Sequence, residues 1–540
     1  MEKEENTKNT KKLKINIGLI KYIFSFLLLI LAYTNYSSKK FLLCSTIELL
    51  LIVFVANIFN KKGAFGHIVG GLLCLLFNTQ MIIMYFGSSF LSLMMMTNLE
   101  SIKDISGNAF IYVLAVILVI VFSIFPVKHF EIKKVSTLAL LSIVLVLDLL
   151  FTQCFGNTYS PLYAYIDLGR KEYASIVQRN KFKNQPNRLD EYFAGGIYDA
   201  RKKPDNLGEQ PNVILFLTEG LSQNIIDDDR NIMPNVREYE SKSLSFTNYY
   251  NHTFATYRGI IGQLYSGYQM ENFDANTLVS AQEIFSDLGY DTFYINAEPN
   301  NVQFTTYLEN MGFDEVIGEP GNYNGEADGM SDKESFELLR NTLHEKNKSG
   351  KPFFAVIYTF GTHASFRSPD EVFGNENNPE LDKFYNLDCE FGKFMDDFNG
   401  SDLADNSIVV FSTDHATYAD KAYNDTFPDH VRVSPYVDRV PFFIYYNGVE
   451  PETVDVSGRN SLDLIPTVFD YLDISAPNYF LGLSLFTSAE SGHTYDTIFY
   501  NNSDTLGTDG NTIAPLSESR QKIFDTGIEG YFIAKLQRLK

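Results

Sequence analysis

The chain has 540 residues, a formal net charge of −22 and four cysteines. Its length exceeds one ordinary globular domain, and its acidic balance argues against a nucleic-acid partner, because phosphate backbones are bound by Lys and Arg. Three cysteines lie in apolar runs and Cys389 stands alone in the polar half, so neither a disulfide framework nor a cysteine-rich zinc site is expected.

Residues 15–155 are dominated by Leu, Ile, Val and Phe. A helix needs about 20 apolar residues to cross the hydrocarbon core of a bilayer. We therefore predict a transmembrane domain at residues 1–155, with five spans near 15–35, 41–60, 66–88, 108–127 and 135–155. A cleaved signal peptide would show one short apolar core instead. The alternative is a buried helical bundle in a soluble protein.

Basic residues indicate which loops face the cytoplasm. Lysines precede the first span and follow the second and the fourth: Lys8, Lys11, Lys12, Lys14, Lys61, Lys62, Lys128, Lys133 and Lys134. Cytoplasmic loops carry an excess of such residues, and the main exception here is Lys39 with Lys40. Five spans then place the rest of the chain outside, so we predict a multi-pass protein of the cell membrane with an extracellular domain.

The polar part of the chain divides into a linker and a domain. We predict a juxtamembrane helix and linker at residues 156–208, with an amphipathic stretch at Tyr163–Val177, and an α/β domain at 209–540. Short apolar runs alternate there with helical stretches, which is typical of a largely parallel sheet between helices. The runs lie at 212–217, 291–297, 353–360, 407–412 and 440–446.

Polar side chains follow three of these predicted strands. Glu219 follows the run at 212–217, His363 follows 353–360, and Asp414 with His415 follows 407–412. Ligands collect at the carboxyl ends of strands in open α/β sheets. Glu, Asp and His without thiolates suit a divalent metal such as Mn²⁺, Mg²⁺ or Zn²⁺. Taken singly, each carboxylate could be a helix cap or solvated, and each histidine structural.

A nucleophile is available at Thr256. It precedes a helix-like run with apolar residues at Ile260, Ile261 and Leu264. At a helix N-terminus the dipole and the free N–H groups favour an anion, and a coordinated metal lowers the pKa of a hydroxyl. The alternative is that Thr256 or Thr253 is simply the N-cap of that helix.

Several motifs together resemble the alkaline-phosphatase/sulfatase superfamily and, within it, the membrane-anchored lipoteichoic acid synthase type. They are NVILFLTEGLS, TYRGIIGQLYSG, GTHASF, FSTDHATY, RVPFFIYYNG and SLDLIPTVFDYL. With the five spans, the resemblance covers nearly the whole chain. It implies that Glu219, Thr256, Asp414 and His415 bind one divalent metal, Mn²⁺ before Mg²⁺ or Zn²⁺. Thr256 would also be the nucleophile, and His363 would contact the substrate phosphate.

The resemblance also implies a reaction. The enzyme would move a phosphoglycerol-like or phosphoethanolamine-like group from a membrane phospholipid, through a Thr-linked intermediate, to a cell-envelope glycan or teichoic acid-like polymer. One alternative is a membrane-anchored hydrolase, either a sulfatase or a phosphodiesterase. The chain lacks the C-x-P-S-R and S-x-P-S-R modification motifs, which counts against a formylglycine sulfatase. Another alternative is a non-catalytic envelope binding module.

The chain departs from lipoteichoic acid synthases around the head-group site. In lipoteichoic acid synthases a His follows the second core strand, and a Trp-x-Arg element lies shortly beyond it. Both are used for the glycerol-phosphate head group. Here the strand ends in Asn296-Ala297, and the chain contains no Trp. Arg258 could replace the missing phosphate contact, because a guanidinium binds two oxygens at once, or it could be a surface residue. We therefore expect Asn296, Arg258 and His363 to decide the substrate.

Overall fold

The computed structural model describes most of the chain. The described residues are 19–87, 89–91, 109–127, 136–155, 159–182, 185–197, 199–321, 329–363, 370–375, 378–488, 494–502 and 504–537. They divide between two compact units, one within residues 1–91 and 109–170, the other from residue 171 to the C-terminus. Each unit has its own hydrophobic core.

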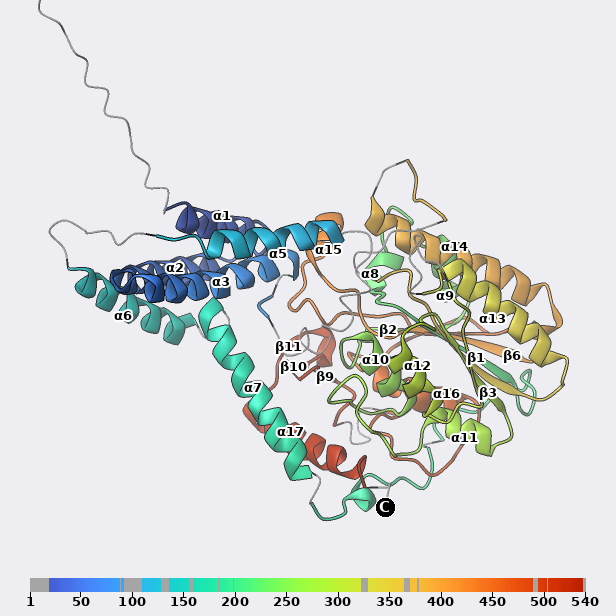
Figure 1. Ribbon diagram of the computed structural model, residues 1–540. Helices are drawn as coiled ribbons and strands as arrows, with labels where there is room; N and C mark the ends of the chain where they lie inside the picture. The colour runs from blue at the N-terminus through green and yellow to red at the C-terminus, as the bar shows by residue number, and fades with distance from the viewer. Residues whose placement is uncertain are drawn as a thin grey trace, which may run out of the picture. The chain divides into compact units, whose positions relative to one another are not determined.

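The N-terminal unit is a set of apolar helices (Figure 1). They are α1 (Ile20–Asn35), α2 (Lys39–Phe59), α3 (Ala64–Gly87), α5 (Ala109–Ser123) and α6 (Thr137–Phe155). Three helical stretches are long and apolar enough to cross a membrane, at Lys39–Lys62, Ala64–Gly87 and Thr137–Phe155. The spans expected near 15–35 and 108–127 appear as shorter apolar helices among the described residues.

Some predictions for this unit fall outside the described residues. These are the outer parts of the expected spans, at 15–18, 88, 108 and 135, and the lysines at 8–14 and 128–134 that carry the predicted orientation. Within the described part, α6 exposes Leu145, Val146, Leu149 and Leu150. Contiguous apolar surface of this kind marks a membrane or protein contact.

A buried glutamate fastens the start of the next helix, α7 (Pro161–Phe182), which contains the amphipathic stretch Tyr163–Val177. Glu48 on α2 accepts a hydrogen bond from the backbone N–H of Leu162 at 2.8 Å, and a second from the hydroxyl of Ser160. The first turn of α7 has free N–H groups that need such acceptors. The predicted linker segment is therefore helical from Pro161 to Phe182.

The C-terminal unit is built on a main sheet, beside a small antiparallel sheet of β9 (Ile498–Tyr500), β10 (Thr505–Gly507) and β11 (Ala514–Pro515). Among the described residues the strands of the main sheet lie in the order β4-β3-β5-β1-β6-β7-β2-β8. They are β1 (Asn212–Thr218), β2 (Leu244–Thr247), β3 (Asp291–Asn296), β4 (Glu315–Ile317), β5 (Phe353–Tyr358), β6 (Ser407–Thr413), β7 (Phe443–Tyr445) and β8 (Glu452–Asp455). The first five strands in this order, β4, β3, β5, β1 and β6, are all parallel to one another. The predicted α/β domain with a largely parallel sheet is confirmed.

One predicted strand differs. The run 440–446 forms only β7, which is antiparallel to both β6 and β2. Pro441 has no N–H to donate to a ladder, so regular pairing begins after it. The short strands β2, β4 and β8 had no distinct apolar signal in the sequence.

Helices cover both faces of the sheet (Figure 1). Side chains alternate along β1: Val213 and Leu215 enter one core, while Ile214 and Phe216 enter the other. The first core includes α10 (Thr256–Leu264), α11 (Ala281–Asp287), α16 (Leu464–Tyr471) and α17 (Glu518–Ala534).

The second core includes α9 (Pro234–Ser241), α13 (Asp332–Asn347) and α14 (Pro379–Asn399). Smaller elements are α8 (Gln223–Ile226), α12 (Val302–Glu309) and α15 (Lys421–Thr426).

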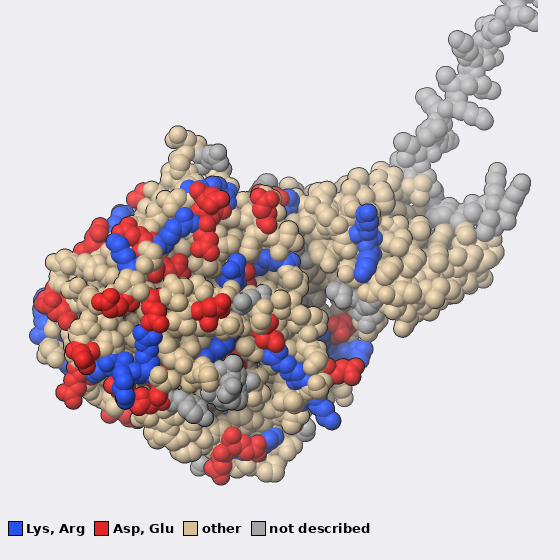
Figure 2. Space-filling view, turned by 180° about the vertical axis from the view of Figure 1, so that it is seen from behind, with Lys and Arg blue, Asp and Glu red and all other residues tan. Residues whose placement is uncertain are grey.

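Charge separates the two units. Figure 2 shows Lys, Arg, Asp and Glu interspersed over the α/β unit, whereas the helical unit shows few of them on this face. The net charge of −22 is therefore carried mainly by the α/β unit, which has an aqueous surface.

Candidate active site

Two neighbouring strands bring three predicted residues together. Thr218, the last residue of β1, pairs in register with Thr413, the last residue of β6. Glu219 follows the first strand, and Asp414 with His415 follows the second. Because the strands are parallel and adjacent, the residues just beyond them meet at one edge of the sheet.

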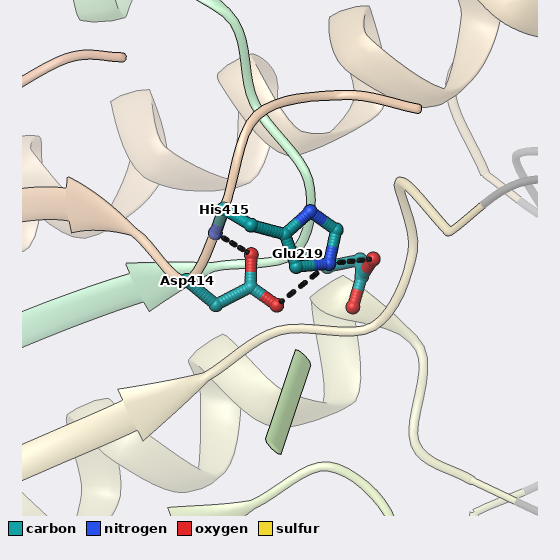
Figure 3. A group of neighbouring side chains, drawn as sticks. All are labelled: Glu219, Asp414 and His415. Carbon is teal, nitrogen blue, oxygen red and sulfur yellow. Dashed lines mark hydrogen bonds and ion pairs between the residues drawn. The ribbon is translucent and has the colours of Figure 1, made fainter. Parts of the chain in front are cut away.

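Glu219, Asp414 and His415 form a compact buried group (Figure 3). Their potential ligand atoms all lie within 4.8 Å of one another. His415 Nε2 is 3.5 Å from Glu219 Oε1 and 3.5 Å from Asp414 Oδ2. A set of two carboxylates and one imidazole is suited to a divalent metal ion.

Hydrogen bonds around the group leave the right atoms available for a metal. His415 Nδ1 donates to the Ala416 carbonyl at 2.8 Å, so Nε2 keeps its lone pair and faces the two carboxylates. Asp414 Oδ1 accepts from the Gly220 N–H at 2.8 Å. Asp414 Oδ2 is buried and has no hydrogen-bond partner among the described residues. Such an orphaned carboxylate oxygen is costly unless a cation compensates it, so the residues fit a metal ion.

The electrostatics agree with this geometry. Burial, and next the nearby Glu219 carboxylate, raise the pKa of Asp414 well above its usual range. Burial also lowers the pKa of His415, which favours the neutral imidazole that ligates metals. A divalent cation would reverse the penalty on Asp414, because it supplies the missing opposite charge.

Thr256 is the first residue of α10, and its hydroxyl faces the group. Its Oγ1 donates to Glu219 Oε2 at 2.9 Å and lies 3.5 Å from His415 Nε2. Thr256 is half-buried, whereas its neighbours in sequence are buried. It is therefore the accessible member of a buried cluster.

The N-cap alternatives for the two threonines are wrong. The N-cap of α10 is Ala255, which makes no side-chain cap, and the hydroxyl of Thr253 donates to the Tyr500 carbonyl at 2.7 Å. Ala255 has φ of 86°. A non-glycine residue in this region stores strain of about 1–3 kcal/mol, and such residues cluster at functional sites.

Two further residues on α10, not singled out from the sequence, seat the helix on the end of β6. A β-carbon on Gly259 would lie 2.2 Å from the Asp414 carbonyl oxygen, so only glycine permits this approach. Gln263 Nε2 donates to the carbonyls of Thr413 and Asp414 at 2.9 and 3.3 Å. The sequence signal that could have indicated this contact was Gly259 itself, a glycine inside a predicted helix.

The end of β5 fixes Glu219. Tyr358 donates its hydroxyl to Glu219 Oε2 at 3.0 Å, the same oxygen that accepts from Thr256. The N–H of Glu219 donates to the Thr359 hydroxyl at 3.3 Å, and Thr362 donates its hydroxyl to the Glu219 carbonyl. Sequence reasoning missed Tyr358, because a strand's last side chain can face either way.

His363 comes directly after this segment. Its ring lies 5.3 Å from that of Phe360. The pKa of His415 is lowered first by burial and to a smaller extent by the nearby His363. His363 therefore belongs to the surroundings of the group. The rest of the GTHASF motif, from residue 364, lies outside the described residues.

Arg258 is not a surface residue: it is fully buried. Its Nε donates to Asn272 Oδ1 at 3.2 Å and its Nη1 to the Asn501 carbonyl at 3.4 Å. Residues two apart on a helix point in different directions, so these contacts lie on another side of α10 from those of Thr256. A contact between Arg258 and a substrate phosphate stays a prediction.

Asn296 shapes the turn that follows β3. Its Oδ1 accepts from the Glu298 N–H at 2.9 Å, and its Nδ2 donates to the Thr305 hydroxyl at 2.9 Å. Asn296 also pairs in register with Tyr358, so this turn lies at the same sheet edge as the cluster. Direct contact of Asn296 with a substrate stays a prediction.

Comparison with known proteins agrees with the fold. A protein-family model described as sulfatase matches residues 211–474, a range that contains the cluster, Thr256 and His363. Among solved structures, a protein of the alkaline phosphatase superfamily from Vibrio parahaemolyticus has 17% identity and a TM-score of 0.52, over 65% of this chain and 91% of that chain.

Two further enzymes of known structure have a similar fold. The lipoteichoic acid synthase LtaP from Listeria monocytogenes has 17% identity and a TM-score of 0.50, over 62% of this chain and 95% of that chain. The integral membrane lipooligosaccharide phosphoethanolamine transferase A from Neisseria meningitidis has 13% identity and a TM-score of 0.52, over 89% of this chain and 96% of that chain. At these identities the likeness concerns the fold.

Proposed function

We propose that this chain, whose residues 211–474 match the sulfatase family model, is a metal-dependent transferase with Thr256 as its nucleophile. The observation that carries the proposal is the position of the Thr256 hydroxyl, 2.9 Å from Glu219 Oε2 and 3.5 Å from His415 Nε2. A hydroxyl placed among potential metal ligands is the arrangement needed for an activated nucleophile.

Glu219, Asp414, His415 and Thr256 would hold the ion, with Mn²⁺ as the proposed metal. When bound, the metal ion lowers the pKa of the hydroxyl and neutralises charge on the phosphoryl oxygens. Tyr358 orients the Glu219 carboxylate by its hydrogen bond of 3.0 Å. His363, which is only partly buried, would contact the phosphate of the entering substrate.

The reaction has two steps. In the first, Thr256 Oγ1 loses its proton and forms a bond to phosphorus, while the bond between phosphorus and the diacylglycerol oxygen breaks. Diacylglycerol takes up a proton and leaves. In the second, an acceptor hydroxyl gives up its proton and bonds to phosphorus, and the released Thr256 oxygen is reprotonated. Each step exchanges one P–O bond for another.

We propose a membrane phospholipid as donor and a cell-envelope glycan or teichoic acid-like polymer as acceptor. The apolar helices and the fold shared with two envelope-modifying enzymes support this choice. The α/β unit would then lie on the extracellular side of a multi-pass membrane protein. Phosphodiester hydrolysis at the same site would differ only in using water as the acceptor.

The test uses the full-length protein in detergent micelles with Mn²⁺. The donors are phosphatidylglycerol and phosphatidylethanolamine that carry a fluorescent acyl chain, and the readout is fluorescent diacylglycerol. We expect release by the wild type, none by Thr256→Ala, and a head-group phosphate adduct on the Thr256 peptide by mass spectrometry. Thr253→Ala is the matched control, because its hydroxyl serves only the Tyr500 carbonyl among the described contacts.

Two results would contradict the proposal. One is release that survives Thr256→Ala, and the other is no release from either lipid by protein that has bound Mn²⁺. Adding envelope glycan then separates transferase from hydrolase: a transferase labels the glycan, whereas a hydrolase frees the head-group phosphate.

A further inference from the structure

The proposed metal ligands lie just beyond the regular part of the sheet. The parallel ladder between β1 and β6 ends at the pair of Thr218 and Thr413. Glu219 then follows on one loop, and Asp414 with His415 on the other (Figure 3). A metal site tolerates deviations of only about 0.2 Å in its ligand distances, so contacts outside the ladder have to hold these two loops together.

Backbone groups of the two loops make part of this contact. The Gly220 N–H donates to Asp414 Oδ1 at 2.8 Å, and the Leu221 N–H donates to the His415 carbonyl at 3.1 Å. Gly220 has φ of 42°, and a β-carbon on it would lie 3.4 Å from Cε1 of the His415 ring. The two loops are therefore in direct contact where they carry the ligands.

Thr417 closes the far end of this contact, two residues after the last ligand. Its Oγ1 donates to the Gly220 carbonyl at 2.6 Å and accepts from the Ser222 N–H at 3.0 Å. In return, the Thr417 N–H donates to Ser222 Oγ at 3.1 Å. All three residues are buried. The ligands thus lie between the strand ladder on one side and these reciprocal hydrogen bonds on the other.

Arg432 holds the backbone of Thr417. Its Nη1 donates to the Thr417 carbonyl, and its Nε lies 3.5 Å from Asp438 Oδ2. Asp438 Oδ1 accepts from the Arg439 N–H at 2.9 Å, and the Arg439 carbonyl accepts from the Gln223 N–H at 2.8 Å. Because Gln223 directly follows the loop after β1, these contacts form a closed ring that passes through both loops.

We propose that Thr417 is a positioning residue for the metal centre: its hydroxyl locks the loop after β1 to the loop after β6 and so sets the metal affinity of the site. The inference rests on the metal site of the proposed function. Without the hydroxyl, the buried Gly220 carbonyl and Ser222 N–H lose this partner. The two loops are then free to separate, although every proposed ligand is still present.

Calorimetric titration of the full-length protein with Mn²⁺ measures the effect. Thr417→Val removes the hydroxyl and keeps the shape of the side chain. Loss of a group that orients metal ligands typically costs about 10- to 100-fold in metal affinity. We expect a loss of this size in Thr417→Val. Thr417→Ser keeps the oxygen and should bind Mn²⁺ like the wild type.

Thr467 offers a closely matched control. It is buried in α16, and its Oγ1 donates to the Asp463 carbonyl at 2.6 Å and accepts from the Leu485 N–H at 2.9 Å. Thr467→Val therefore removes the same two kinds of hydrogen bond at a place outside both ligand loops. We expect a similar fall in the thermal unfolding midpoint in EDTA from both Val variants, and a loss of Mn²⁺ affinity in Thr417→Val alone.

Metal concentration separates positioning from general damage to the enzyme. Thr417→Val should need roughly 10- to 100-fold more Mn²⁺ than the wild type for half-maximal diacylglycerol release, and should approach the wild-type rate at saturating Mn²⁺. Ser222→Ala tests the same contact from the other loop. It removes the acceptor of the Thr417 N–H and keeps the Thr417 hydroxyl, so its loss of Mn²⁺ affinity should be smaller and in the same direction.

The outcomes separate this inference from the proposed function. Wild-type Mn²⁺ affinity in Thr417→Val overturns the role of Thr417, as does wild-type affinity in Ser222→Ala if Thr417→Val does not fold. An equal loss in Thr467→Val also overturns it, because the affinity would then follow overall stability. Wild type that binds Mn²⁺ and releases no diacylglycerol ends the proposed transfer, and the titrations still decide the role of Thr417. Wild type that binds neither Mn²⁺, Mg²⁺ nor Zn²⁺ ends both.

Discussion

Gly259 lies against the backbone of Asp414. A β-carbon on Gly259 would stand 2.2 Å from the Asp414 carbonyl oxygen and 2.7 Å from its carbonyl carbon. Gln263, one turn further along α10, donates to the Thr413 carbonyl at 2.9 Å. The helix that begins with Thr256 therefore rests directly on the segment that carries Asp414 and His415, and this contact requires a residue without a side chain.

Gly259→Ala should move the nucleophile. Backbone atoms at Asp414 cannot rotate away from the new methyl group, so α10 must shift by a fraction of an ångström or more. We expect a loss of about 1–3 kcal/mol of stability and a fall in diacylglycerol release of roughly 100-fold. Gly195→Ala is the control, because no atom of the described part of the chain lies within 4 Å of its β-carbon position. Wild-type activity in Gly259→Ala would show that the contact does not position Thr256.

Asp414→Asn should separate metal binding from folding. Among the described residues Asp414 Oδ2 has no hydrogen-bond partner, and burial together with the neighbouring Glu219 raises the pKa of Asp414, so the metal-free site disfavours the Asp414 carboxylate. We expect Mn²⁺ to raise the thermal unfolding midpoint of the wild type, by the equivalent of about 2.7 kcal/mol at 100 times the Kd. The variant should lose that rise and be at least as stable as the wild type in EDTA.

The readout is the unfolding midpoint of the full-length protein with Mn²⁺ and with EDTA. Asp402→Asn, an exposed position, is the control and should respond to Mn²⁺ like the wild type. An equal Mn²⁺-dependent rise in Asp414→Asn would remove Asp414 from the ligand set.

Tyr358→Phe should weaken the metal site while keeping every proposed ligand. Two described residues donate to Glu219 Oε2, Tyr358 and Thr256, and this change removes the first donor. Removing a partner that orients a metal ligand typically costs about 10- to 100-fold in affinity. We expect a loss of that size in Mn²⁺ affinity by calorimetric titration.

The matched control for this change is Tyr294→Phe. Tyr294 is also a buried strand tyrosine, and its hydroxyl has no hydrogen-bond partner in the described part of the chain. Its loss should leave Mn²⁺ affinity unchanged. If both variants bound Mn²⁺ like the wild type, the hydrogen bond of Tyr358 would have no role in holding Glu219.

Asp332→Asn should change how stability depends on pH. Asp332 accepts from the Gly361 N–H at 2.9 Å, two residues before His363. Burial raises its pKa from 3.8 to about 7. Because the folded state holds this proton more tightly than the unfolded state, wild-type stability is lost as pH rises from about 4 to 7.

The Asn side chain of the variant does not titrate in this pH range, so the variant should not show this loss of stability. The difference in stability, variant minus wild type, should rise between pH 4 and 7 by up to about 4 kcal/mol and stay constant above pH 7. Unfolding midpoints measured across this range give the slope, and the titration of Asp414 cancels because both proteins share it. A difference that does not change with pH would contradict the raised pKa.

The strands and the residues at their ends could be predicted because their signals are local. An apolar run followed by Glu219, and another followed by Asp414 and His415, need only a few neighbouring residues to be recognised. The parallel sheet then brings such ends to one edge. The antiparallel direction of β7 could not be predicted, because strand direction depends on the path of the chain between strands.

Other parts of the site depend on packing. Tyr358, Gln263 and Thr417 act through hydrogen bonds to residues distant in the sequence, and nothing in their own neighbourhood indicates a partner. Arg258 illustrates the same limit, since its sequence position fitted a surface residue and it is fully buried. Which side of a helix or strand faces the site is decided only when the elements pack.

The sequence by itself determined the kind of chemistry, because metal ligands and a nucleophile are defined by side-chain type and by their place after apolar strands. Tertiary structure alone decided which atoms meet: that Thr256 Oγ1 and the Tyr358 hydroxyl share one oxygen of Glu219, and that the Thr417 hydroxyl binds the Gly220 carbonyl. The physical reason is how far apart in the sequence the interacting residues lie. Side-chain identity and periodicity are local properties, whereas hydrogen bonds of about 3 Å form between residues that only the packed sheet and helices bring together.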